Sequence, residues 1–248
     1  NTGLLKEIKK EKIKEFAKRY DKFPKFDMPS AIFNTASTQI PVLLLGSFFN
    51  TTIVGYFSLS HRIISIPMSL IGSSIGQVFF QKTAEVKNNK EVLRNITLST
   101  YRNLLRIGIM PFSIIFSFGD ILFSFVFGKD WIVAGKYAQA LSVWILFVFI
   151  SSPISTLCLT LEKQREGLIF NVLIFLSRIF VIVFGALYLN DAYITILLYG
   201  VISTIFWAGW SLYLLNLSLV DIRHELLRTM MYVILFIGGL TLLRELIL

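Results

Sequence analysis

The chain has 248 residues, of which 55% are hydrophobic and only 16% are charged, and its mean hydropathy is +0.70. A soluble domain usually carries about a quarter charged residues, so this composition excludes a water-soluble globule and indicates an integral membrane protein. The net charge of +9 lies in short segments between long apolar runs, which excludes a nucleic-acid-binding surface and favours the anionic face of a bilayer as the partner.

Cysteine and histidine are too few for a disulfide framework or a structural metal site. The sequence has one cysteine, Cys158, and two histidines, His61 and His224, which lie far apart. A single cysteine forms no internal disulfide, and the three side chains show no zinc-ligand spacing. We therefore expect neither a metal nor another cofactor.

Residues 1–27 form a polar segment with nine Lys or Arg residues. Its apolar residues fall roughly on one helical face, which predicts a short amphipathic helix. These residues are Leu5, Ile8, Ile13, Phe16 and Tyr20. The segment has no short apolar stretch with a cleavage site and is therefore not a signal peptide. The chain starts with Asn1 rather than Met, and we expect it to begin in the middle of a longer protein.

Seven long apolar segments follow, each close to the ~20 residues that a helix needs to cross a bilayer. Backbone groups in lipid must be satisfied within their own segment, so these segments are predicted to be helices. The predicted spans are 28–50, 54–80, 106–128, 137–161, 167–190, 192–217 and 229–248. Proline removes a backbone hydrogen bond and predicts a kink where it lies inside a span. Such prolines are Pro41, Pro67, Pro111 and Pro153.

The segment between the second and third spans is amphipathic. Apolar residues recur near helical spacing with Lys87, Lys90, Arg94 and Arg102 between them. This pattern predicts a separate helix over 82–104 that lies at the membrane interface. A solvated linker helix is an equally good interpretation of the same pattern.

Basic residues alternate from one side of the membrane to the other. Nineteen of the 24 Lys and Arg residues lie in segment 1–27 and in every second connection after it. Cytoplasmic loops are enriched in Lys and Arg. We therefore expect this side, with the N-terminal end of the chain, to face the cytoplasm.

Arg62 and Arg178 are the charged residues that lie deepest in the predicted spans. Arg62 is eight residues into the second span, or about 12 Å deep, and Arg178 is eleven residues into the fifth, or about 17 Å deep. Ionisable residues at such depth cost several kcal/mol and usually face an interior cavity. An ion pair between Arg62 and Asp120 is the alternative, because Asp120 is the acid that lies within a span. Without such a pair, two buried arginines favour an anionic ligand such as a pyrophosphate or an acidic sugar.

Small and polar residues share a helical face with these arginines. Ser58, Arg62, Ser65, Ser69, Gly72 and Gly76 form one stripe in the second span. Asn171 lies seven residues before Arg178, and Asn34 and Thr38 lie on one face of the first span. We interpret Asn34, Thr38 and Asn171 as lining the cavity, although such stripes also form where membrane helices pack closely. His61, beside Arg62, is a further cavity candidate, as a packing residue or as a proton carrier.

A stretch of about sixty residues resembles a known family. It comprises FPKFDMPS at 23–30, QIPVLLL at 39–45, VGYFSL at 54–59 and IGQVF at 75–79, with Arg62, Pro67, Gly72 and Gln81. Together these resemble the C-terminal half of Wzx-type polysaccharide flippases, also called polysaccharide biosynthesis or O-antigen export proteins. They belong to the multidrug/oligosaccharidyl-lipid/polysaccharide exporter superfamily.

The resemblance implies a MATE-like fold of two six-helix lobes that face each other. Residues 28–217 would be the second lobe, 229–248 an extra C-terminal helix and 1–27 the cytoplasmic connector to a missing N-terminal lobe. The family moves undecaprenyl-pyrophosphate-linked oligosaccharides across the bacterial inner membrane by alternating access. Its cavities are cationic, which Arg62 and Arg178 would match, and Gln77 within the quoted stretch is a further cavity candidate.

Two other functions remain open on sequence grounds. A drug or metabolite exporter of the same superfamily would share the fold, but such transporters use membrane acids for cation coupling, and this half offers only Asp120. A membrane-bound polysaccharide polymerase or ligase would require a large outward loop with polar catalytic residues, and the loops here are short. The sequence shows no nucleophile–base arrangement, so we expect no enzyme activity.

Overall fold

A computed structural model describes residues 23–247 of the chain. All regular structure in this range is helical, as the composition predicts. The helices are η1 Phe23–Asp27, α2 Met28–Phe48, α3 Thr51–Pro67, η2 Met68–Gly72, α4 Ser73–Glu85, α5 Lys90–Phe127, η3 Lys129–Trp131, α6 Ile132–Ile154, α7 Leu157–Thr160, α8 Gln164–Phe184, η4 Gly185–Leu189, α9 Ala192–Leu217 and α10 Ile222–Ile247. The amphipathic helix predicted within 1–27 lies outside the described residues except for 23–27, which form η1.

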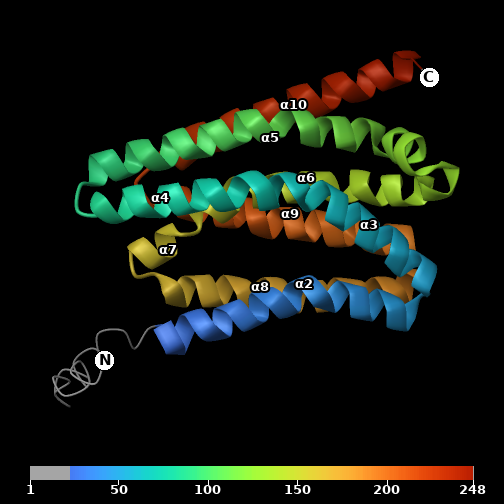
Figure 1. Cartoon of the computed structure of the whole chain (residues 1–248), viewed down its shortest axis with the longest axis horizontal. Coiled ribbons are helices and arrows are strands. Elements are labelled where there is room, and N and C mark those ends of the chain that lie inside the picture. Colours follow the sequence, from blue (N-terminus) through green and yellow to red (C-terminus); the bar gives the residue numbers. More distant parts are fainter. Residues whose placement is uncertain (1–22, 248) are drawn as a thin grey trace, which may run out of the picture.

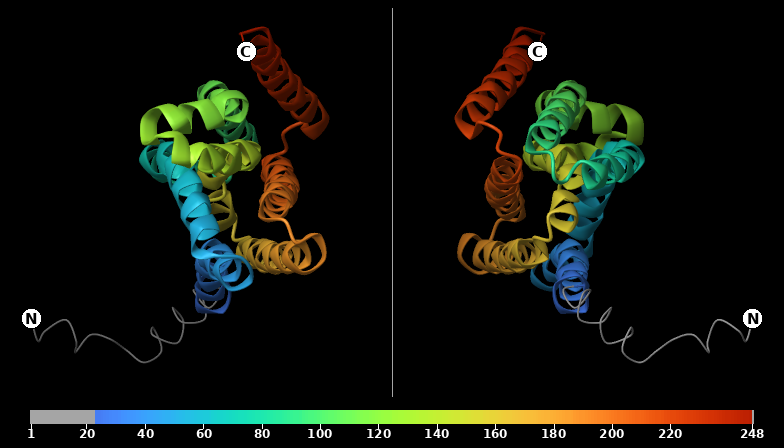
Figure 2. Two further views of the ribbon diagram at one scale, coloured as in Figure 1. Left: turned by 90° about the vertical axis from the view of Figure 1, so that its right-hand side faces the viewer. Right: turned by 90° about the vertical axis from the view of Figure 1, so that its left-hand side faces the viewer.

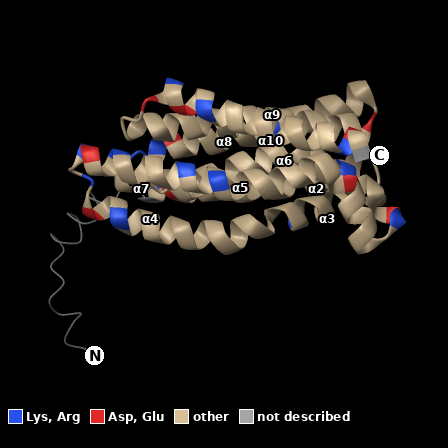
Figure 3. Ribbon diagram, turned by 90° about the horizontal axis from the view of Figure 1, so that it is seen from above, with Lys and Arg blue, Asp and Glu red and all other residues tan. Residues whose placement is uncertain are grey.

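Within this described range, seven helical stretches are long and apolar enough to cross a membrane, which confirms the predicted all-helical, seven-span architecture. Each corresponds to one predicted span, and several are longer. The second runs through α3, η2 and α4 for 35 residues, the third is α5 with 38, and the fourth, Lys129–Thr160, has 32. Charged residues gather towards the two ends of the bundle and leave the middle of the helices mostly uncharged (Figure 3), as expected for helices that cross a bilayer.

The structure has no separate helix over 82–104. The chain makes a short turn after Glu85, and α5 then runs without a break from Lys90 to Phe127. The two helices form a hairpin that projects beyond the ends of the neighbouring helices (Figure 1). The amphipathic pattern therefore has another cause: Leu93, Tyr101 and Leu104 are buried within the bundle, and the basic residues cover the outer side of the same helix.

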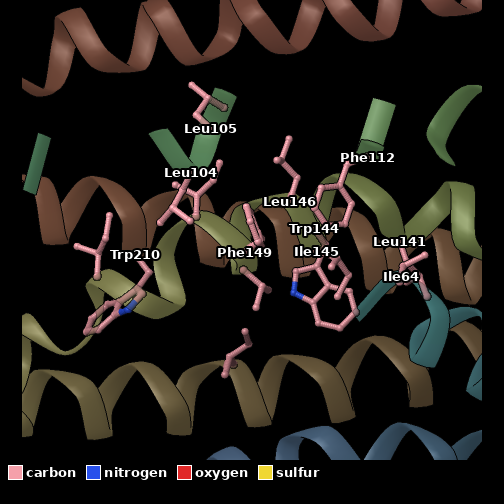
Figure 4. Packing of buried hydrophobic residues seen from close by; sticks show 14 of the residues in the cluster. Ile64, Leu104, Leu105, Phe112, Leu141, Trp144, Ile145, Leu146, Phe149 and Trp210 are labelled. Atoms are coloured by element: carbon pink, nitrogen blue, oxygen red, sulfur yellow. The ribbon is translucent and has the colours of Figure 1, made fainter. Parts of the chain in front are cut away.

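Helix α6 is the centre of the bundle. Two thirds of its most apolar window (67%) is buried, against 6% for the last span. Seen end-on, α6 lies between α3, α5 and α9 (Figure 2). Leu146 and Phe149 of α6 point towards α5, whereas Trp144 points to the other side (Figure 4). Helices α2 and α8 lie side by side at the edge of the bundle that faces Trp144 (Figure 1).

Glycines bring α5 and α6 close together. A Cβ atom on Gly119 would lie only 2.8 Å from the backbone oxygen of Gly135, and a Cβ on Gly108 would lie 2.9 Å from the Phe149 ring. Small residues allow this approach in membranes, where association depends on van der Waals packing rather than on the hydrophobic effect. Gly72 and Gly76 of the predicted stripe also face Pro153 of α6, where a Cβ would lie at ordinary contact distances of 3.8 and 3.5 Å.

Helix starts carry local signals. The side chains of Asn50, Asn89 and Asp191 precede α3, α5 and α9, and each accepts a hydrogen bond from the backbone N–H three residues later, at 2.9, 3.2 and 2.9 Å. Such N-caps satisfy N–H groups that have no partner inside the helix. They fix the ends of three spans at the residues where the chain reverses direction.

Candidate functional site: a buried arginine and a polar helix surface

Arg178 of α8 joins two helices. Its guanidinium Nη1 donates hydrogen bonds to the backbone oxygen of Ser37 at 2.8 Å and to the Ser37 hydroxyl at 2.7 Å. Ser37 lies on α2, and the Arg178 side chain is only 4% exposed. Arg178 therefore connects α2 to α8 in the interior of the bundle rather than facing open space.

Pro41 explains why the Ser37 carbonyl is available to Arg178. In an α-helix the carbonyl of residue 37 would accept a bond from the N–H of residue 41. Residue 41 is Pro41, which has no N–H, and α2 continues through it. The free carbonyl would be costly in an apolar environment, and the guanidinium satisfies it.

Aromatic rings complete the surroundings of Arg178. Its Cζ atom lies 5.0 Å from the ring centroid of Trp144 on α6 and 5.5 Å from that of Tyr199 on α9. His61 of α3 stacks on Trp144 at 5.5 Å. Cations over aromatic faces are stabilised by the ring quadrupole. Within residues 23–247 no carboxylate pairs with Arg178, so rings and backbone dipoles replace a counter-ion.

The same two helices make a second polar contact one heptad earlier. Asn171 of α8 donates to the Ser30 hydroxyl of α2 at 2.7 Å. Ser30 and Ser37 are seven residues apart, as are Asn171 and Arg178, so the two pairs form a ladder along two helices that lie side by side. The sequence predicted the α8 face of this ladder but missed Ser37, Trp144 and Tyr199. The signal that could have identified Ser37 is Pro41, four residues further on.

A polar cavity of about 230 Å³ lies beside this ladder, between α2, the end of α6, α8 and α9. Asn34 and Asn171 line it, together with Asp27, Gln164 and Trp207. Asp27 Oδ2, Gln164 Oε1 and Trp207 Nε1 are buried without a hydrogen-bond partner. Buried polar atoms of this kind are normally satisfied by water or by a ligand, so the cavity is suited to a small polar occupant.

Arg62 lies in different surroundings from Arg178. It is exposed on the surface of α3, eleven residues after Thr51 and thus about 17 Å along the helix. The alternative pair with Asp120 is wrong, because Asp120 instead accepts from Arg244 of α10 at 2.7 Å and from Gln139 at 3.2 Å. Sequence reasoning placed both arginines on cavity faces, but the structure buries one and exposes the other.

Three other predicted site residues are exposed, as Arg62 is. Thr38, Asn34 and Gln77 are all exposed on α2 and α4. We refer to the four exposed residues Asn34, Thr38, Arg62 and Gln77 together as the polar surface of α2–α4, although Asn34 also lines the polar cavity. The predicted stripe on the second span divides after Ser69, because the π-helical turn η2 follows Pro67 and shifts the register. Beyond it, Gly72 and Gly76 face α6.

The exposed polar groups of this arrangement are of the kind that binds ligands. No group of three His, Cys, Asp or Glu side chains that could hold a metal ion occurs among residues 23–247. The polar surface offers one fixed positive charge and several amide and hydroxyl groups. Guanidinium, amide and hydroxyl groups are the donors that bind phosphates and sugars.

Comparisons with known proteins point to polysaccharide biosynthesis. A sequence model of the family described as "Polysaccharide biosynthesis protein" matches residues 11–136. The teichuronic acid biosynthesis protein TuaB of Bacillus subtilis (strain 168) is 24% identical over 153 residues, which cover 62% of this chain and 31% of TuaB. No solved structure matches. The chain, a multi-pass helical membrane protein, belongs to the polysaccharide biosynthesis protein family.

Proposed function

We propose that this chain is one lobe of a flippase that moves an undecaprenyl-pyrophosphate-linked oligosaccharide across the bacterial inner membrane. The transport would proceed by alternating access, for surface polysaccharide biosynthesis. The chain matches 31% of the length of the relative TuaB. Within this proposal, a second lobe of the same protein completes the cavity, and the end of the chain with residues 1–27 faces the cytoplasm.

The observation that carries the proposal is the exposure of Arg62. A charged side chain in the middle of a membrane-spanning helix is costly if it faces lipid. Arg62 has no ion-pair partner within residues 23–247 and lies on the outside of this bundle. An aqueous cavity between two lobes removes that cost, and guanidinium binds phosphate oxygens with two parallel hydrogen bonds.

The other candidate functions receive less support. A cation-coupled drug exporter needs an available acid within its spans, whereas Asp120 is already paired with Arg244. A polymerase or ligase needs a sizeable outward domain, whereas the connections that the structure describes on that side are short, for example Phe49–Asn50 and Asn190–Asp191.

The test replaces Arg62 in the whole protein. Arg62→Ala and Arg62→Lys are expressed in a strain that depends on the protein for its surface polysaccharide. We expect Ala to reduce export by at least about tenfold, which corresponds to ~1.4 kcal/mol for one charged hydrogen-bonding partner, and Lys to retain part of it.

Arg165→Ala is the matched control, because Arg165 is exposed near the start of α8 and outside the polar surface. Its export should equal that of wild type. Comparable amounts of each variant in the membrane must be verified by immunoblot. Undiminished export by Arg62→Ala would remove the basis of the proposal.

A further inference from the structure

A second, larger groove lies between α4 and α5. Its volume is about 630 Å³. We call it the α4–α5 groove, and its lining residues are Ser74, Ile75, Val78, Phe79, Lys82, Val92, Asn95, Ile96, Ser99, Thr100 and Asn103. It forms because α5 packs mainly on α6, so that α4 and α5 diverge from their common turn.

The groove presents polar side chains that have no partner in the described part of the protein. Asn95, Ser99 and Asn103 follow one another at intervals of four residues and form a row along α5. Lys82 lies opposite them on α4. None of these four side chains makes a hydrogen bond or an ion pair within residues 23–247. They offer an ammonium, two amides and a hydroxyl to a ligand.

The groove lies at the end of the bundle where the hairpin projects. Helix α5 has 38 residues and is therefore about 57 Å long, against about 30 Å for the hydrocarbon core. The groove lies in the first third of α5, so it reaches the level of the lipid head groups and beyond. The hairpin around it, residues 82–94, carries four basic and two acidic residues, so the positive charge there attracts anions.

Exposed apolar residues line and adjoin the groove, and one further cation, Arg106, is exposed on the same face of α5, three residues after Asn103. On α5, Ile107 and Met110 continue the row of Asn95, Ser99 and Asn103, and they are 50% and 59% exposed. On α4, Val78 inside the groove is 54% exposed. A ligand that fits this surface has an anionic, hydrogen-bonding head and a long apolar tail that points into the membrane.

We propose that the α4–α5 groove binds an anionic phospholipid of the surrounding leaflet, with the phosphate against Lys82 and the acyl chains along Ile107 and Met110. The amides of Asn95 and Asn103 hydrogen-bond the head group. The inference does not depend on the proposed flippase function. The lipid stabilises the projecting hairpin, whose two helices touch little within the groove.

The experiment measures lipid retention by the purified full chain in detergent micelles, by native mass spectrometry. The chain is incubated with phosphatidylglycerol or with phosphatidylcholine of the same chain length. We expect wild type to retain phosphatidylglycerol in preference. Lys82→Gln should lower its affinity for phosphatidylglycerol by about fivefold, the effect of one lysine near a charged lipid surface. Asn95→Leu should weaken retention as well.

The matched control is Lys129→Gln, which removes the same charge from the exposed turn η3 at the opposite end of the bundle and should leave retention unchanged. Both positions are exposed, so an unchanged melting temperature is expected and excludes unfolding. Equal retention by wild type and Lys82→Gln would overturn the proposal, as would equal retention of the two lipids.

Two competitors test the identity of the occupant. Inorganic phosphate at millimolar concentration should not displace phosphatidylglycerol, because it lacks the apolar tail. Displacement by phosphate would mean that the groove binds free anions. A polyprenyl pyrophosphate that displaces phosphatidylglycerol at equal concentration would mean that the groove belongs to the substrate path. Either result would overturn the assignment to a phospholipid.

Discussion

At the scale of single residues, Pro41 and Arg178 work as a pair. The proline leaves the Ser37 carbonyl without its helical donor, and the arginine donates to it from α8. The sequence indicates that Arg178 is unusual, because an arginine in mid-span is rare. It does not identify the partner, because Ser37 is 141 residues away and no local pattern specifies which helix packs against α8.

Arg178→Met should lower the free energy of unfolding in micelles by about 2 kcal/mol, because two hydrogen bonds from a charged donor are lost. In a Pro41→Ala background the cost should fall by about 1 kcal/mol, because the alanine has a backbone N–H that can donate to the Ser37 carbonyl. The measurement is a double-mutant cycle of chemical denaturation. Arg165→Met, at an exposed arginine, should stay within about 0.5 kcal/mol of wild type. Strict additivity of the two substitutions would contradict the pairing.

At the scale of elements, the seven spans were predictable because an apolar run of about 20 residues matches the thickness of a bilayer and exceeds what a soluble core usually requires. The error over 82–104 has a physical cause. An amphipathic pattern reports only that one side of a helix is buried, and burial against protein and burial against a membrane interface produce the same periodicity. Pro67 predicted a kink in the second span but not the π-helical turn η2 that follows it. This turn changes which face α4 presents relative to α3.

Helix α10 offers a test of element packing. It is little buried, and ion pairs fasten it to α5 towards both ends, Arg102 with Glu225 and Asp120 with Arg244. Glu225 is 3% exposed. Glu225→Ala should therefore lower the free energy of unfolding by about 2 kcal/mol.

Exchange of the charges, Arg102→Glu with Glu225→Arg, should restore most of the lost stability, measured by thermal denaturation in micelles. The pair Lys163–Glu166 is the control, because its side chains are 45% and 35% exposed. Glu166→Ala should change stability by less than about 1 kcal/mol. If the exchanged pair were as unstable as Glu225→Ala, the ion pair would not be what holds α10.

At the scale of the whole molecule, charge distribution and topology agree. Consecutive spans run in opposite directions, so the described chain starts and ends on opposite sides of the bundle (Figure 1). The α4–α5 turn lies at the end where the described chain begins, and η3 lies at the other end. Lys25, at the start of the first span, and the basic residues of the α4–α5 turn therefore lie on one side, which the positive-inside rule predicts to be cytoplasmic.

This orientation can be checked by thiol labelling in intact cells. Cys158 is buried and is first replaced by Ala. Asp130→Cys in η3 should then react with a membrane-impermeant maleimide, whereas Asn88→Cys in the α4–α5 turn should react only after the cells are permeabilised. The reverse labelling pattern would mean that the basic side faces outwards.

The lack of a carboxylate partner for Arg178 among the described residues also affects the electrostatic potential inside the bundle. A guanidinium keeps its proton at any physiological pH, so the interior of the lobe carries a fixed positive potential. At an effective dielectric constant of about 20, a monovalent cation about 10 Å away is disfavoured by about 1.7 kcal/mol. Channels that exclude protons and metal cations use the same kind of electrostatic barrier. If the proposed flippase function holds, a cargo path that passes within this distance of Arg178 would still disfavour monovalent cations.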